Sequence, residues 1–202
     1  MTRPRGASPI YAADDPAGLE RAVALLRRGR LVAFPTDTVY GVGADARQPQ
    51  AIAHIYVVKG RPPDKAIPLL VAGAADIAPF VSHIPAAARR LMEAFWPGGL
   101  TLVLPIAAGV SDIVSRGPGI AVRMPDHPAA LALIRRLGAP LAATSANRSG
   151  CADPLDAGAV AAQLGRRIDL ILDGGPTPGG RASTVLDLTA LPGRIVRAGP
   201  IS

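Results

Sequence analysis

Proline and glycine punctuate this chain from end to end, with 21 Pro and 22 Gly spread over 202 residues. Because Pro ends helices and central strands and Gly marks turns, this spacing divides the chain into many short elements. No linker, internal repeat or low-complexity tract separates one part from another. We therefore expect a single domain over residues 1–202, which is an ordinary size for one.

Helical and extended patterns alternate between these breaks. The first helix is expected to begin at Pro16 with Asp15 as its cap, and to end at Gly29. Alternation of this kind predicts an α/β domain, a twisted mixed sheet of parallel and antiparallel strands flanked by helices. Further helices are expected over 49–58, 85–95, 128–137 and 157–164, and strands over 30–35, 67–72, 100–106, 120–124, 140–144, 170–172, 184–188 and 194–197.

Composition excludes several classes of protein. With 49% apolar and 18% charged residues, the chain can bury a sizeable core and is not intrinsically disordered. A single cysteine, Cys151, excludes an internal disulfide and a cysteine-based zinc site. The most apolar stretch, residues 66–81, is interrupted by Pro68, Asp76 and Pro79, and no apolar run follows the first ten residues. We expect a cytoplasmic protein with no membrane partner.

The net charge of +7 is carried almost entirely by arginine, because only two of the 22 cationic residues are lysines. Both of them, Lys59 and Lys65, fall within one seven-residue stretch. A basic chain is suited to anionic partners, although a positive charge also simply keeps a protein soluble. Composition leaves both interpretations open.

Four polar or glycine-rich segments follow expected strands or helices, where open α/β sheets place their ligands. Residues 35–43 carry two threonines and two glycines, which favours a close backbone approach to a ligand or an ordinary capped turn. Residues 59–65 hold three cations, suited to a polyphosphate or to a solvated loop. Residues 144–150 offer Ser and Asn to a ligand or form a turn, and residues 174–184 form a lid or a surface loop.

Several familiar chemistries lack their motifs. No G-x-x-x-x-G-K-[ST] is present, so an ATP site here is not a Walker P-loop, and no serine lies in a G-x-S-x-G elbow. The three histidines, His54, His83 and His127, are scattered and form no close ligand pair. We expect no metal site built by the protein alone.

Seven short motifs nevertheless occur in order from about Leu19 to Gly199, and together they are specific. They are Pro35-Thr-Asp-Thr-Val-Tyr-Gly, Lys59-Gly-Arg-Pro, Phe95-Trp-Pro-Gly, Val122-Arg-Met-Pro, Ser145-Ala-Asn-Arg-Ser-Gly, Asp173-Gly-Gly-Pro and Ser183-Thr-Val-Leu-Asp. This set resembles the YrdC/TsaC family, the threonylcarbamoyl-AMP synthases. Since the chain ends soon after Arg197, it resembles the short form without an additional C-terminal domain.

The resemblance implies an enzyme, a nucleotidyltransferase, that joins L-threonine, bicarbonate or carbon dioxide, and ATP into threonylcarbamoyl-AMP and releases pyrophosphate. ATP would enter with Mg²⁺ bound mainly by its phosphates. The product would pass to the proteins that transfer the threonylcarbamoyl group to tRNA, as the first step of threonylcarbamoyladenosine (t6A) modification. The implied fold is a YrdC-like α/β sheet with a concave basic cleft.

Roles for individual residues also follow from the resemblance. Lys59 and Arg61 would be catalytic and would hold the ATP phosphates. A simpler alternative for Arg123 is an ion pair with a nearby acid such as Asp126. The implied ATP-binding residues are Lys59, Arg61, Lys65, Ser145, Asn147 and Arg197, and the implied threonine-binding residues are Thr38, Arg123 and Ser183.

Two other functions compete with this one. A paralogue with the same fold would bind nucleotide without making the adenylate. A binding module would use the basic surface to hold tRNA or double-stranded RNA, with an affinity that falls steeply with salt.

Overall fold

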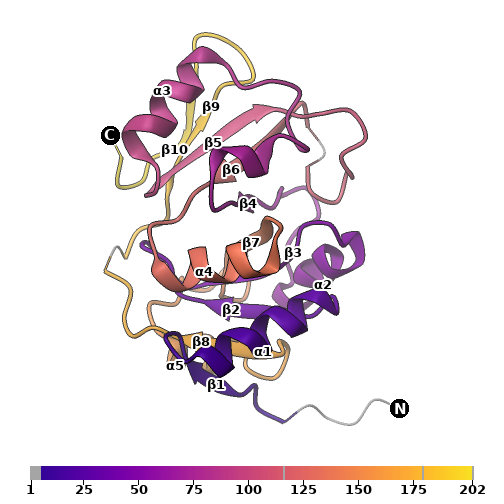
Figure 1. The fold of residues 1–202 in the computed structure, drawn as a ribbon, viewed down its shortest axis with the longest axis vertical. Coiled ribbons are helices and arrows are strands. Elements are labelled where there is room, and N and C mark those ends of the chain that lie inside the picture. The colour runs from indigo at the N-terminus through magenta and orange to yellow at the C-terminus, as the bar shows by residue number, and fades with distance from the viewer. Residues whose placement is uncertain (1–5, 116, 179, 202) are drawn as a thin grey trace.

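Ten strands form one sheet in the computed structural model, which describes residues 6–115, 117–178 and 180–201 (Figure 1). Their spatial order is β1-β8-β2-β3-β7-β4-β6-β5-β9-β10. The sheet contains parallel neighbours such as β2 and β8 and antiparallel neighbours such as β2 and β3, which confirms the expected mixed sheet. The strands are β1 (Ile10–Ala12), β2 (Val32–Phe34), β3 (Gly41–Asp45), β4 (Leu69–Leu70), β5 (Leu100–Pro105), β6 (Gly119–Arg123), β7 (Leu141–Ser145), β8 (Leu170–Asp173), β9 (Thr184–Asp187) and β10 (Arg194–Arg197).

All five expected helices are present, and a short 3₁₀ helix, η1 (Ala74–Ile77), accompanies them. The start of the first helix agrees with its sequence signal, because the Asp15 carboxylate accepts hydrogen bonds from the N–H groups of Ala17 and Gly18, both at 3.0 Å. The helices are α1 (Pro16–Arg27), α2 (Pro49–Lys59), α3 (Ala86–Phe95), α4 (Pro128–Leu137) and α5 (Ala157–Leu164).

The segment expected to be a glycine-rich loop contains a central strand instead. Gly41 and Gly43 lie in β3, fully buried between β2 and β7. A side-chain carbon on Gly41 would lie 3.3 Å from the Phe34 ring, and one on Gly43 only 3.1 Å from it. The two glycines therefore make room for Phe34 within the sheet. The edge strand β1 was likewise not expected from the sequence.

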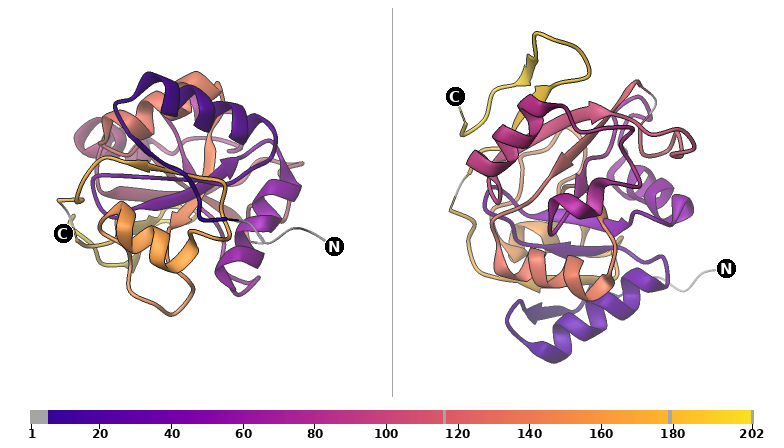
Figure 2. Two further views of the ribbon diagram at one scale, coloured as in Figure 1. Left: turned by 90° about the horizontal axis from the view of Figure 1, so that it is seen from below. Right: turned by 45° about the horizontal axis from the view of Figure 1, so that its top comes forward.

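Helices cover the two faces of the sheet unequally. On one face, α1 and α4 pack over β8, β2 and β7 in a cluster that reaches as far as Leu70 of β4 among the described residues. On the other face, α2, α3 and α5 contribute to a second cluster that extends to β5 and β6. The view from below shows the sheet between α1 and α4 on one side and α2 and α5 on the other (Figure 2). α1 and α4 therefore leave the β6–β5–β9 part of the first face uncovered, and a cleft opens there.

Within the described ranges, no helix combines the length and the apolar character needed to cross a membrane.

Candidate functional site

A cleft of about 420 Å³ opens on the part of the sheet that α1 and α4 leave uncovered. Strand alternation selects the side chains that face it: Ala121 and Arg123 of β6 line the cleft, while Val122 between them is packed in the opposite core. Six of the nine residues predicted for the site line this one cleft. They are Thr38, Arg61, Arg123, Ser145, Ser183 and Arg197.

Arg123 is buried at the end of β6 and its guanidinium is held at three points. Nη2 donates to Asp37 Oδ1 at 2.6 Å, Nη1 to Thr38 Oγ1 at 2.9 Å, and Nε to the carbonyl of Gly98 at 2.9 Å. The sequence left open an ion pair between Arg123 and a nearby acid such as Asp126. The ion pair is present, but its acid is Asp37 and not Asp126. The Asp126 side chain is exposed, and only its backbone N–H joins the network, donating to Asp37 Oδ1 at 3.0 Å.

Two threonine hydroxyls extend the network from Arg123. Thr36 donates its only hydroxyl proton to the carbonyl of Val39 at 2.7 Å. The Thr38 hydroxyl is therefore the donor in its 3.0 Å contact with Thr36 Oγ1, and its own oxygen accepts from Arg123. Both hydroxyls are thus fixed in direction at one wall of the cleft.

Ser183 and Arg197 contact each other in another part of the cleft lining. Arg197, the last residue of β10, donates from Nε and Nη2 to the carbonyl of Ser183 at 3.0 and 2.8 Å. Its Nη2 also donates to Ser183 Oγ at 3.1 Å, and that hydroxyl lies 2.8 Å from the hydroxyl of Thr101. The C-terminal strand therefore brings a guanidinium to the cleft and holds the segment before β9.

Arg61 and Lys65 belong to one loop but occupy different surroundings. The guanidinium of Arg61 lines the cleft and donates to the carbonyls of Lys65 and Ala66, at 3.2 and 2.7 Å. Lys65 is exposed and is absent from the cleft lining, so its backbone carbonyl is its contribution to this wall. Of the two cations, Arg61 alone reaches the cleft.

Lys59 lies beneath the cleft rather than along it. Its ammonium donates to the carbonyls of Ser145 and Asn147 and to Asn147 Oδ1, the last at 3.0 Å. The same Oδ1 accepts from Ser145 Oγ at 2.6 Å, and Asn147 Nδ2 donates to the carbonyl of Cys151. All three ammonium protons are used, so Lys59 supports the turn that presents Ser145 to the cleft.

Positive charge accumulates around the cleft. Burial lowers the pKa of Arg61 and of Arg123, and the charge of Arg197 lowers both further. Burial, together with the charge of Arg61, lowers the pKa of Lys59 to about 8. A single acid, Asp153, lines the cleft among the described residues. Three guanidiniums gathered in one cleft are typical of an anion-binding site.

The segment predicted to be a lid is fastened to the cleft in this structure. The Tyr40 hydroxyl donates to the carbonyl of Gly175 at 2.7 Å and accepts from the N–H of Gly174 at 3.0 Å, and burial raises the pKa of Tyr40 to about 12. The N–H of Gly180 donates to the carbonyl of Thr38 at 3.1 Å. Gly179 in this segment lies outside the described residues.

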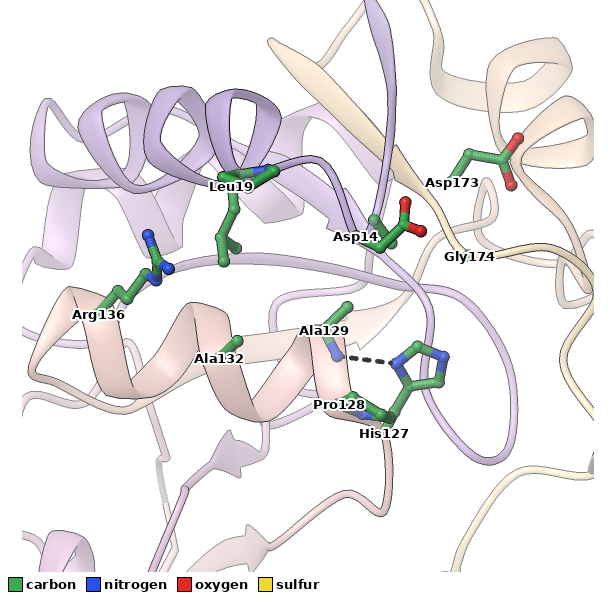
Figure 3. A pocket seen from close by; sticks show the side chains of 11 residues that line it. Asp14, Leu19, His127, Pro128, Ala129, Ala132, Arg136, Asp173 and Gly174 are labelled. Carbon is green, nitrogen blue, oxygen red and sulfur yellow. Dashed lines mark hydrogen bonds between the residues drawn. The ribbon is translucent and has the colours of Figure 1, made fainter.

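A second cavity, of about 550 Å³, lies between the N-terminal ends of α1 and α4. Figure 3 shows Asp14, Asp173 and the His127 ring among the residues that line this cavity. The His127 ring accepts from the N–H of Ala129 at 3.2 Å, and Arg136 lies farther along α4. Burial lowers the pKa of His127. None of the nine residues predicted for the site lines this cavity, so the cleft on the open sheet face is the better candidate site.

The comparison with protein families agrees with the motif order. A family model, Sua5_yciO_yrdC, described as telomere recombination, matches residues 24–199. The chain belongs to this family. A threonylcarbamoyl-AMP synthase from Bacillus subtilis is 48% identical over 175 residues, which are 86% of this chain and 50% of that protein. The chain thus spans about half the length of this Sua5/YrdC relative.

Solved structures of family members share the fold. A crystal structure of Pyrococcus abyssi Sua5 complexed with L-threonine superposes with a TM-score of 0.90 and 40% identity, over 96% of this chain and 57% of that one. Escherichia coli YciO gives a TM-score of 0.84 at 26% identity, over 99% of this chain and 97% of its own. Both likenesses support the YrdC-like fold expected from the sequence.

Sequence reasoning assigned no role to several residues of this YrdC-like site. Asp37 pairs with Arg123 across 86 positions of sequence, so no local pattern could reveal their contact. Asp153 and Thr101 reach the cleft from a loop and from β5, and Tyr40, within the motif that begins at Pro35, also lines it. Across the described residues, no three His, Cys, Asp or Glu side chains come together as metal ligands.

Proposed function

We propose that this chain synthesises threonylcarbamoyl-AMP from L-threonine, bicarbonate and ATP, with release of pyrophosphate. One observation carries the proposal: the guanidiniums of Arg61, Arg123 and Arg197 converge on a single cleft together with Ser145, Thr38 and Ser183. The substrates supply matching anions, a triphosphate and an amino-acid carboxylate. The likeness to a threonine-bound family member and the activity named for the Bacillus relative support it.

The residues divide into two groups in this proposal. Arg61 and Arg197 bind the phosphates of ATP, and Ser145 binds the nucleotide on the turn that Lys59 and Asn147 support. Lys65 does not bind ATP in this proposal, because its side chain is exposed outside the cleft. Arg123, Thr38 and Ser183, which line the same cleft, bind threonine.

The reaction then needs little proton transfer by side chains. The threonine amine adds to carbon dioxide and loses a proton, giving a carbamate. A carbamate oxygen attacks the α-phosphorus of ATP, the new P–O bond forms, and the bond to the β-phosphate breaks so that pyrophosphate leaves. The guanidiniums hold the two substrates in line and neutralise charge on the phosphates, which lowers the barrier by positioning and electrostatics.

Mg²⁺ would accompany ATP in this proposal, held by phosphates and water. The cleft lining offers one carboxylate, Asp153, which is too few for a metal site built by the described residues themselves. Transfer of the product to tRNA by further proteins, and therefore a cytoplasmic location, belong to the same proposal.

Pyrophosphate release tests the proposed function. ATP, bicarbonate and folded protein should yield pyrophosphate when L-threonine is added, and little without it or with amino acids other than close analogues such as serine. Omission of bicarbonate should also stop the release. Folded protein that binds ATP or double-stranded RNA tightly but shows no threonine-dependent release would instead be a non-catalytic member of the family.

A further inference from the structure

Asp37 lies behind Arg123 and outside the lining of the cleft. Its Oδ1 accepts from Arg123 Nη2 at 2.6 Å and from the N–H of Asp126 at 3.0 Å. The Arg123 side chain is 7% exposed and the Asp37 side chain 17% exposed. The pair is therefore an ion pair largely shielded from water, with a second hydrogen bond that fixes the carboxylate.

The contacts of Arg123 leave part of its guanidinium free. A guanidinium has five N–H bonds, and those to Asp37, Thr38 and Gly98 use three. One N–H remains on each of Nη1 and Nη2. These two donors belong to a group that also lines the cleft, so they are available to a ligand there.

Asp37 also opposes a force that would move Arg123. The neighbouring charge of Arg197 repels the guanidinium, whereas Asp37 attracts it. The other guanidiniums of the cleft, Arg61 and Arg197, form no ion pair within the described residues and bond to backbone carbonyls instead. Of the three guanidiniums in the cleft, that of Arg123 is therefore the one that forms an ion pair with a carboxylate among the described residues.

We propose that Asp37 is a positioning residue, which fixes the Arg123 guanidinium so that its two free N–H groups receive the carboxylate of L-threonine. Holding a long side chain in its bound geometry before the ligand arrives avoids an ordering cost during binding. This inference rests on the proposed function, since it takes threonine as the ligand.

Asp37→Asn removes the charge but keeps an oxygen for the N–H of Asp126. We expect the Kd and KM for L-threonine to rise by about tenfold, the effect of losing one charge-assisted contact. The Kd for ATP and kcat at saturating threonine should stay within about twofold, because Asp37 acts through one threonine-binding residue. Asp126→Asn is the matched control: it removes the adjacent exposed charge and should leave both affinities unchanged.

A double-mutant cycle separates positioning from a structural role. In an Arg123→Gln background, Asp37→Asn should cause no further loss of threonine affinity, because its effect passes through Arg123. A full additional loss, or equal losses of threonine and ATP affinity, would overturn the assignment. If Asp37→Asn does not fold, Asp37→Glu replaces it, since the charge stays but its oxygens move, and the same split between threonine and ATP is expected.

Measuring threonine binding to the wild-type protein distinguishes failure of the role of Asp37 from failure of the proposed function. If Asp37→Asn binds threonine as tightly as the wild-type protein does, the role of Asp37 is overturned and the proposed function stands. Wild-type protein that binds no threonine overturns both.

Discussion

Replacing Arg61 with alanine should abolish most turnover and leave the fold intact. Its guanidinium lines the cleft and bonds to the carbonyls of Lys65 and Ala66, which are exposed to water. Water replaces those two bonds, so the free energy of unfolding should fall by less than about 1 kcal/mol. Because the proposed function assigns Arg61 to the ATP phosphates, its loss should lower kcat/KM for ATP by about 10²- to 10³-fold.

The same loop supplies the control for this prediction. Lys65→Ala removes a cation four residues away that lies outside the cleft, and should change kcat/KM for ATP by less than about threefold. Arg61→Lys keeps the charge without the forked geometry and should fall between the two. Pyrophosphate release at varied ATP gives the rates, and thermal melts give the stability. Full turnover by Arg61→Ala, or an equal loss in Lys65→Ala, would refute the assignment of phosphate binding to Arg61.

Three further perturbations test other parts of the site and fold. ATP affinity should fall as the pH rises through about 8, because the pKa of Lys59 lies there and its neutral amine cannot donate to all three acceptors. Titrations of ATP binding at several pH values should show this fall. Lys59→Arg should flatten the pH profile. Ala121→Leu adds bulk to the cleft floor and should block ATP and threonine binding, measured by calorimetry, with a melting temperature close to wild type. Gly43→Ala places a carbon 3.1 Å from the Phe34 ring and should destabilise the protein by about 1–3 kcal/mol in urea unfolding, whereas an unchanged midpoint would show that Phe34 can move.

The helices could be predicted from local signals because each carries its own. Asp15 caps α1, prolines begin α1, α2 and α4, and the predicted bounds of α4 and α5 agree with the structure. The interior strand β3 could not be predicted, because Gly41 and Gly43 are ordinary turn residues in a local view. Their place in a strand depends on the Phe34 ring across the sheet, which is a tertiary contact.

The residues that gather in the site could be predicted from the sequence, but the separate role of each could not. The motif order identified residues that meet in one cleft from the loop after α2 and from β6, β7 and β10. Sequence could not separate Arg61 from Lys65, since both are cations of one loop, nor reveal that Lys59 is buried beneath Ser145. It also named Asp126 as the alternative partner of Arg123, because distance along the chain hides Asp37.

The central claim is that threonine, bicarbonate and ATP react together in the cleft of Arg61, Arg123 and Arg197. The most direct measurement is mass spectrometry of the product formed from ¹³C-bicarbonate, L-threonine and ATP, with Arg61→Ala in parallel. The account predicts an adenylate that carries the labelled carbon and the threonine, formed by wild-type protein and nearly absent with the variant. Folded wild-type protein that consumes no ATP, or that releases pyrophosphate without forming a labelled threonine adenylate, would contradict it.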